Sequence, residues 1–284
     1  MADDAPTNKY ILHNENELTR LAWQHRIIKD AMNNKLVWAP VDLNRSALRI
    51  LDSGTADGIW IRDLQSDLTP NDAQHSYVGI DIERSYFPSS PPKNTSYHVQ
   101  DVNGTYPTEW KESFDLIHQR LTLCVSGGVE STLNAVKKQV ELLKPGGWIQ
   151  YVELQGWTAD TDGRGWKDFT TCVTELVVSV GSSVTHIDRT KGWLQDLGLV
   201  DVEEVVLEGN FGTRDDKELE PLAKKSALLT AQSVLGVAQT FPQELLSLPV
   251  ERIPQIKGDL EKEMNTDPTN AHWHYKVVWG RKPQ

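Results

Sequence analysis

Cysteine is scarce in this chain of 284 residues, which contains only Cys124 and Cys172. The two thiols do not have the spacing of metal ligands, so a cysteine-based zinc site is excluded. They could pair with each other, but a disulfide-stabilised fold needs more cysteines than this. We therefore expect a reduced, intracellular protein.

Positive charge and long apolar runs are also lacking. There are 29 lysines and arginines against 40 acidic residues, and the formal net charge is −11. This balance excludes the basic surface that binds nucleic-acid phosphates. No apolar run is long enough to cross a bilayer, and the first residues lack the pattern of a secretory signal. We expect no nucleic acid and no membrane as partners, and a cytoplasmic location, with the nucleus also open.

What the chain does contain is a glycine turn. Asp52–Gly58 follows the apolar run Leu48–Leu51 and precedes a predicted helix that starts at Ile59. Such a turn brings backbone N–H groups and a helix N-terminus to a polar ligand, and Gly54 permits close approach. The dinucleotide pattern G-x-G-x-x-G/A does not fit, because its last small residue would be Ile59. The pattern D-x-G-x-(G/A)-x-G does fit, although a purely structural turn would explain this loop alone equally well.

Acidic residues end the two strands predicted after this turn. Tyr77–Ile82 predicts a strand that ends at Asp81, and Tyr97–Val102 predicts one that ends at Asp101. A carboxylate at a strand end can accept hydrogen bonds from a ribose diol. Further strands are predicted over Phe114–His118 and Trp148–Glu153. Each acid alone could be a turn or cap residue, but the ordered set is hard to explain in that way.

The order of these motifs resembles that of class I S-adenosylmethionine (SAM) methyltransferases, with Ala56 where that family usually has glycine. The resemblance implies an α/β fold: a Rossmann-like, seven-stranded sheet with helices on both faces, an antiparallel last strand and a helical cap. It implies SAM as cofactor and S-adenosylhomocysteine as product. The residues that it places at the cofactor are Arg20, Asp52, Gly54, Thr55, Gly58, Asp81, Ile82, Asp101, Val102 and Gln119.

A closer resemblance is to the fungal LaeA/UMTA-type methyltransferases, the enzymes and regulators of secondary metabolism. Asn16–His25 is similar to their E-x-x-R-L-x-x-Q-H helix, Phe114–Arg120 to their F-D-L-I-H-x-R element, and Val278–Pro283 to their C-terminal end. The similarity runs from about Glu15 to Pro283. It implies a small-molecule acceptor and leaves a protein partner open.

Methyl transfer from a sulfonium requires the nucleophile and the methyl group about 3 Å apart, and a positioned base helps to remove a proton. His118 is the first candidate base, because open α/β sheets bind their ligands at the carboxyl ends of the strands. Its neighbour Gln119 could instead hold the cofactor. His25 is the second candidate, although a capping or core role would also explain it.

Other site residues follow from the same resemblance. The side chains expected at the substrate are Tyr10, His25 and Trp157. Arg20 and Arg120 could pair with the cofactor carboxylate, or with Glu17, Glu153 or Asp115 in structural ion pairs. His272 and His274 have no evident third ligand, so no metal site is expected.

The sequence divides into four predicted parts. Residues 1–40 form an N-terminal helical cap, residues 41–209 the SAM-binding core, residues 210–268 a helical insertion and residues 269–284 the final strand. The cap and the insertion are expected to cover the substrate.

Three functions remain open at this point. The first is methyl transfer to a small molecule, and the second is a LaeA-like regulatory protein that binds SAM. The third is a non-methylating reaction, such as a cyclisation, on the same fold. The acceptor atom (oxygen, nitrogen, carbon or sulfur) and the oligomeric state are also open.

Overall fold

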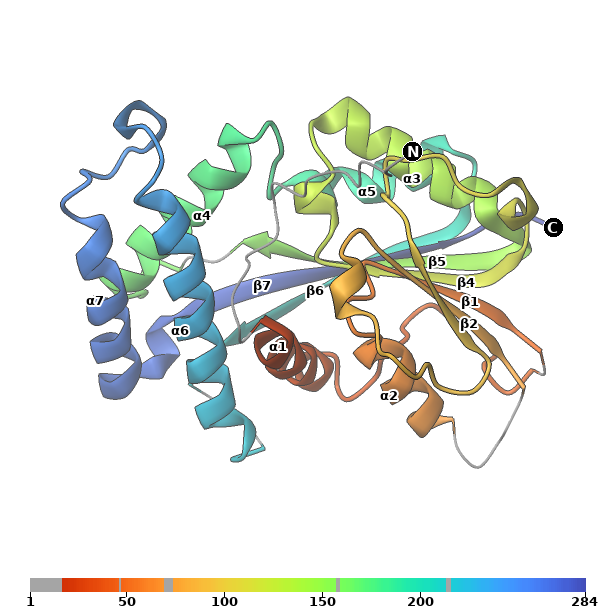
Figure 1. Ribbon diagram of the computed structural model, residues 1–284, viewed down its shortest axis with the longest axis horizontal. Coiled ribbons are helices and arrows are strands. Elements are labelled where there is room, and N and C mark those ends of the chain that lie inside the picture. Colours follow the sequence, from red (N-terminus) through yellow and green to blue (C-terminus); the bar gives the residue numbers. More distant parts are fainter. Residues whose placement is uncertain (1–16, 46, 69–73, 157–158, 213–215) are drawn as a thin grey trace.

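The computed structural model describes residues 17–284, except for 46, 69–73, 157–158 and 213–215. The described residues form a seven-stranded sheet in the order β3-β2-β1-β4-β5-β7-β6, so that β3 and β6 are its edges (Figure 1). The strands are β1 (Arg49–Ser53), β2 (Ser76–Asp81), β3 (Thr95–Val99), β4 (Phe114–Arg120), β5 (Leu143–Gly156), β6 (Val200–Asn210) and β7 (His272–Arg281).

The sheet is mixed. Strands β1 to β5 pair in parallel, whereas β7 runs antiparallel between β5 and β6. Parallel strands are normally covered on both faces, and their central residues are accordingly apolar. Ile50, Ile80, Ile117 and Ile149 are fully buried here. The expected Rossmann-like sheet with an antiparallel last strand is confirmed.

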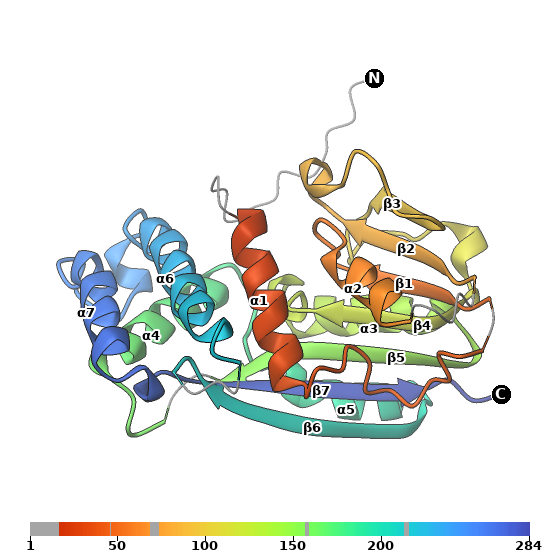
Figure 2. The same ribbon diagram turned by 90° about the horizontal axis from the view of Figure 1, so that it is seen from below.

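Helices cover both faces of the sheet. Helices α1 (Glu17–Ala31) and α2 (Ile59–Asp67) lie on one face, and α3 (Val129–Leu142) and α5 (His186–Asp196) on the other (Figures 1 and 2). Successive strand residues point to opposite faces. Ile50 therefore packs with the α1–α2 side, and the next residue, Leu51, with the α3–α5 side.

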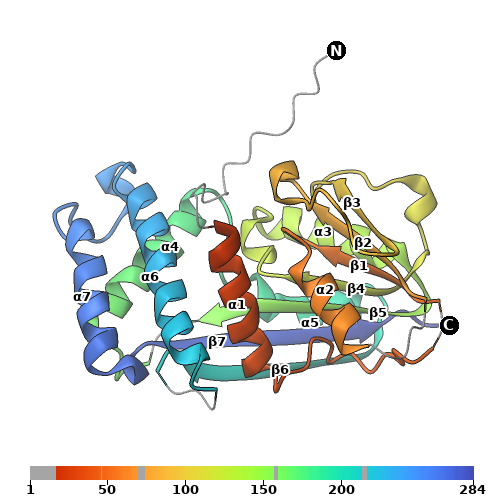
Figure 3. The same ribbon diagram turned by 60° about the horizontal axis from the view of Figure 1, so that its bottom comes forward.

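A third group of helices lies beyond the carboxyl ends of the parallel strands (Figure 2). It consists of α4 (Arg164–Ser179), α6 (Leu219–Ala238) and α7 (Ile253–Thr266), which share a separate apolar core around Trp166, Ile256 and Leu260. Helices α6 and α7 lie in the predicted insertion, whereas α4 comes from the range assigned to the core. Helix α1 stands between α6 and α2 (Figure 3), and so links this group to the sheet.

The predicted C-terminal boundary of one strand is wrong. The strand expected over Tyr97–Val102 is β3, which ends at Val99. Asp101 lies two residues further, where its Oδ1 accepts a hydrogen bond of 2.8 Å from the Asn103 amide. This side-chain-to-backbone bond supports a turn, which competes with continuation of the strand.

Among the residues that the structure describes, no helix has both the length and the apolar composition needed to cross a membrane.

Candidate active site

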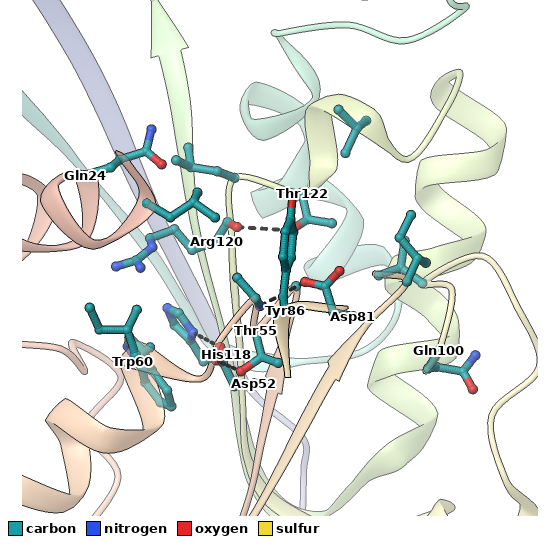
Figure 4. Close-up of a pocket in the computed structure, with 18 of the residues that line it drawn as sticks. Gln24, Asp52, Thr55, Trp60, Asp81, Tyr86, Gln100, His118, Arg120 and Thr122 are labelled. Atoms are coloured by element: carbon teal, nitrogen blue, oxygen red, sulfur yellow. Dashed lines mark hydrogen bonds and ion pairs between the residues drawn. The ribbon is translucent and has the colours of Figure 1, made fainter. Parts of the chain in front are cut away.

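A cavity of about 580 Å³ lies at the carboxyl ends of β1, β2 and β4, with α1 forming part of its wall (Figure 4). This is the place where open α/β sheets bind ligands, and the volume is typical of small-molecule sites. From α1, Glu17, Arg20, Leu21 and Gln24 line it. The end of the sheet and the first helix thus enclose one site.

The glycine turn forms the floor of this cavity. Gly54 has φ = 72°, in the left-handed region, and a Cβ built on it would lie 2.4 Å from Oγ1 of Thr122. Any larger residue would collide with the loop after β4. Thr55 and Ala56 also line the cavity. Gly58 does not. It is the N-cap residue of α2 and has φ = 76°, and a Cβ there would lie 1.9 Å from the Tyr97 hydroxyl oxygen.

Four predicted cofactor residues lie together on one side of the cavity: Asp81, Ile82, Asp101 and Val102. Asp81 accepts backbone hydrogen bonds from Ala56 (2.9 Å) and Glu83 (3.0 Å), one on each oxygen. A carboxylate offers about four acceptor positions, so capacity remains for hydroxyl donors. Burial raises the pKa of Asp81.

His118 and Asp52 form a buried pair on the opposite side (Figure 4). They are aligned partners in the β1–β4 pairing, and 2.7 Å separates Nδ1 of His118 from Oδ1 of Asp52. Because a carboxylate only accepts, Nδ1 carries the hydrogen. The other Asp52 oxygen accepts from the Thr55 hydroxyl at 2.6 Å.

The ring of His118 is fixed from a second direction. It stacks on Trp60 of α2, with 4.0 Å between ring centroids and 3° between planes. Burial lowers the pKa of His118 although Asp52 opposes this change, which favours the neutral ring. No other hydrogen bond to the ring occurs among the described residues, so the Nε2 lone pair is available on this cavity wall.

His25 lies behind the cavity wall. Its Nε2 donates to Asp63 (2.8 Å), and its Nδ1 accepts from Nη2 of Arg120 (3.0 Å). Burial, together with the positive charge of Arg120, lowers its pKa to about 4. Both ring nitrogens therefore have partners and the ring is neutral. The geometry favours His118 over His25 as a proton acceptor.

Two other predicted cofactor residues have protein partners. Arg20 lines the cavity but forms an ion pair of 2.6 Å with Glu17. Gln119 faces the other side of the sheet, where it accepts hydrogen bonds from Ser53 (2.9 Å) and Gln139 (2.6 Å). Alternation along β4 puts His118 and Arg120 on one face and Gln119 on the other. Tyr10 and Trp157 lie outside the described residues.

A buried carboxyl group, that of Glu153, holds the loop that closes the cavity after β4. Glu153 accepts the backbone N–H groups of Thr122 (2.7 Å) and Leu123 (2.9 Å), both on Oε1. Burial raises its pKa to about 8. The residue before this contact, Leu121, has φ = 54°, a region that non-glycine residues rarely adopt. Glu153 thus fixes an irregular segment of the cavity wall.

The wall also includes residues that were not predicted from the sequence, among them Trp60, Tyr86 and Thr122. Trp60 is the second residue of α2, just after the glycine turn, so its position in the sequence was a usable signal. Thr122 lies in the loop after β4 and Tyr86 in the one-turn 3-10 helix Arg84–Tyr86, segments too short for periodicity to carry information.

Known proteins with similar sequences are methyltransferases. Residues 23–204 match the family model described as a methyltransferase domain. The chain is 33% identical to the N-methyltransferase sirN of Leptosphaeria maculans, over 99% of this chain and 97% of that protein. It is 32% identical to the N-methyltransferase gliN of Aspergillus fumigatus, over 97% of both. It is 24% identical to laeA of Emericella nidulans, a secondary metabolism regulator, over 95% of this chain and 71% of laeA.

The chain therefore belongs to the methyltransferase domain family. It is a SAM-dependent methyltransferase that acts on a small-molecule metabolite, and the resemblance to fungal secondary-metabolism methyltransferases is confirmed. The residues present fit the cofactor. The turn at Gly54 leaves no room for a side chain, and Asp81 retains acceptor capacity at the cavity.

Proposed function

We propose that the chain methylates a nitrogen atom of its acceptor and that the Asp52–His118 pair removes the proton. The observation that carries the proposal is the position of this pair: His118 on the cavity wall, neutral, with its Nδ1 hydrogen bonded to Asp52. The names of sirN and gliN as N-methyltransferases support nitrogen as the acceptor atom.

The chemistry divides between cofactor and protein. SAM supplies an electrophilic methyl group and leaves as S-adenosylhomocysteine. Nε2 of His118 takes the proton from the acceptor nitrogen, whose electron pair forms the new N–C bond. Asp52 stabilises the imidazolium that results, as a carboxylate does for a catalytic histidine elsewhere. Stacking on Trp60 holds the imidazole of His118 in one orientation, so less orientational entropy is lost when the acceptor binds.

The other residues would bind rather than react. Asp81 and Asp101 would hold the nucleoside part of the cofactor, with Gly54, Thr55, Ile82 and Val102 as the remaining contacts. Gly58 and Gln119 would support this pocket from behind. Helix α1, backed by α6, would cover the acceptor and exclude water.

A cytoplasmic location belongs to this proposal. Cys124 and Cys172 are both free thiols, as is usual in a reducing compartment.

The function is tested by supplying SAM with a trideuterated methyl group to the purified protein. The acceptors are the metabolites extracted from the organism that carries the sequence. We expect a labelled product whose methyl group is bound to nitrogen by NMR, together with S-adenosylhomocysteine. A label on oxygen, carbon or sulfur would overturn the nitrogen assignment. Cofactor binding without any labelled product would favour a regulatory role or a cyclisation.

Replacing Asp81 with alanine should weaken binding of S-adenosylhomocysteine by about 1.5–3 kcal/mol, since hydrogen bonds to a charged acceptor are lost. Isothermal titration calorimetry measures this directly. The matched control is Asp67→Ala, which removes a half-exposed carboxylate of α2 that lies outside the cavity. Equal affinities in the two variants would remove Asp81 from the cofactor site.

A further inference from the structure

Arg120 is an arginine of the cavity wall for which the described part of the chain provides no carboxylate partner. It ends β4 and lines the cavity, and its side-chain hydrogen bond goes from Nη2 to Nδ1 of His25 at 3.0 Å. No carboxylate lies within ion-pair distance of it among the described residues. Arg20, the other arginine of the wall, is by contrast paired with Glu17 at 2.6 Å. The positive charge of Arg20 is therefore balanced by a neighbouring carboxylate, whereas that of Arg120 is not.

The carboxylates around Arg120 are already engaged. Asp52 accepts from His118 and Thr55. Asp63 accepts from His25 at 2.8 Å and from Lys29 at 2.9 Å. Glu153 accepts the two backbone N–H groups of the loop after β4. None of the three is free to turn towards the guanidinium without breaking a bond that it now makes.

His25 explains how Arg120 is held without losing its charge. A neutral imidazole accepts one N–H of the guanidinium and, through Asp63, is itself fixed to α2. A carboxylate in the same place would orient the guanidinium equally well but would neutralise it. The structure thus orients Arg120 and keeps it cationic, because arginine remains protonated even when buried.

An unpaired cation that is only partly exposed to water is costly, and the sulfonium of a bound SAM would add a second positive charge to the same cavity. A bound anion would offset this positive charge. In Figure 4 Arg120 lies on the side of His118 and Trp60, whereas Asp81 and Gln100 lie on the opposite side. The positive charge is therefore near the proposed base and away from the proposed nucleoside site.

We propose that Arg120 binds an anionic oxygen of the acceptor, such as a carboxylate or an enolate, and that His25 is the positioning residue that aims it. This assignment deepens the proposed function and rests on the acceptor lying beside His118. The same chemistry could come from the carboxylate of the cofactor, so the experiment must separate the two sources.

The test uses benzoate as an anionic probe and benzamide as its neutral counterpart, with calorimetry on the complex with S-adenosylhomocysteine. Benzoate should bind the wild-type complex more tightly than benzamide. Arg120→Met should weaken benzoate about 10–100-fold, the scale of a charged hydrogen bond, and leave benzamide and S-adenosylhomocysteine within a few-fold. Arg120→Lys should restore part of the benzoate affinity, because the charge remains.

The control is Arg45→Met, which removes an exposed arginine that pairs with Asp115 and does not line this cavity. It should leave benzoate binding unchanged. A loss of S-adenosylhomocysteine affinity in Arg120→Met, with benzoate unaffected, would assign Arg120 to the cofactor carboxylate and overturn the proposal. Equal binding of benzoate and benzamide to the wild type would also overturn it. None of these readouts requires methyl transfer, so they stand apart from the test of nitrogen methylation.

Discussion

Replacing His118 with alanine is expected to lower the turnover number roughly 10²–10⁴-fold, the usual effect of losing a general base. The variant lacks the Nε2 lone pair, while Asp52 keeps its bond from Thr55. The affinity of the variant for S-adenosylhomocysteine should stay within a few-fold of the wild-type affinity, since the proposed base faces the acceptor. Steady-state kinetics and calorimetry on the same preparations measure both quantities.

The pH dependence of turnover gives a second readout of the same variant. Burial lowers the pKa of His118 from its ordinary value of 6.5, so the neutral base persists into mildly acidic solution. Wild-type turnover should fall only below that ordinary value, as the ring becomes protonated. In His118→Ala this acid limb should be absent, and the deficit should shrink at high pH, where the acceptor ionises unaided.

The control for His118 is His98→Ala, which removes an exposed histidine of β3 bonded to Ser96. Its turnover should match the wild type. Loss of cofactor affinity in His118→Ala would instead place the residue in the cofactor pocket. An unchanged turnover would mean that the alignment of acceptor and methyl group is sufficient for the reaction without a base at this position.

Glu153 should make the stability of the protein depend on pH. Its pKa is raised by burial to about 8 in the folded state, against 4.5 for an ordinary glutamate. A raised pKa means that the folded state binds the proton more tightly. The contribution to stability is therefore complete below 4.5 and is lost as the pH rises through about 8.

The measurement is urea unfolding of the wild type and of Glu153→Gln between pH 5 and pH 9. The amide retains Oε1, which accepts both backbone N–H groups, but it does not ionise. The free energy of unfolding of the wild type should fall by about 2–4 kcal/mol more than that of the variant over this range. If the free energy of unfolding changed with pH equally in the wild type and in Glu153→Gln, ionisation of Glu153 would carry no cost in the folded state. Glu153→Ala, which frees both N–H groups, should be less stable than Glu153→Gln at every pH.

Much of the sheet could be predicted because its strands are short apolar runs separated by turn residues. The glycine turn, Asp81 and His118 each follow or end such a run, and this order along the chain is enough to place them at one edge of the sheet. The extent of β3 was less predictable, since Gln100 and Asp101 continue the strand-like pattern. The turn is marked by the hydrogen bonds that the backbone N–H groups of Asn103 and Gly104 donate to Asp101.

The site was harder to predict from the sequence than the fold, for two separate reasons. Gln119 was placed at the cofactor although alternation along β4 already assigns it to the face opposite His118, so this information was in the sequence. The relation among Arg120, His25 and Asp63 was not, because the three residues come from β4, α1 and α2 and meet only when these pack. Contacts of this kind depend on tertiary structure and leave no local pattern.

The edge position of β6 has a consequence for self-association. The outer side of an edge strand presents N–H and C=O groups that can pair with the strand of another molecule. Along β6, Glu203, Glu204 and Glu208 are all exposed. A second copy that added its own β6 there would bring rows of carboxylates close together, and like charges on adjacent strands repel. The acidic residues of this strand thus discourage the sheet from continuing into a neighbouring molecule.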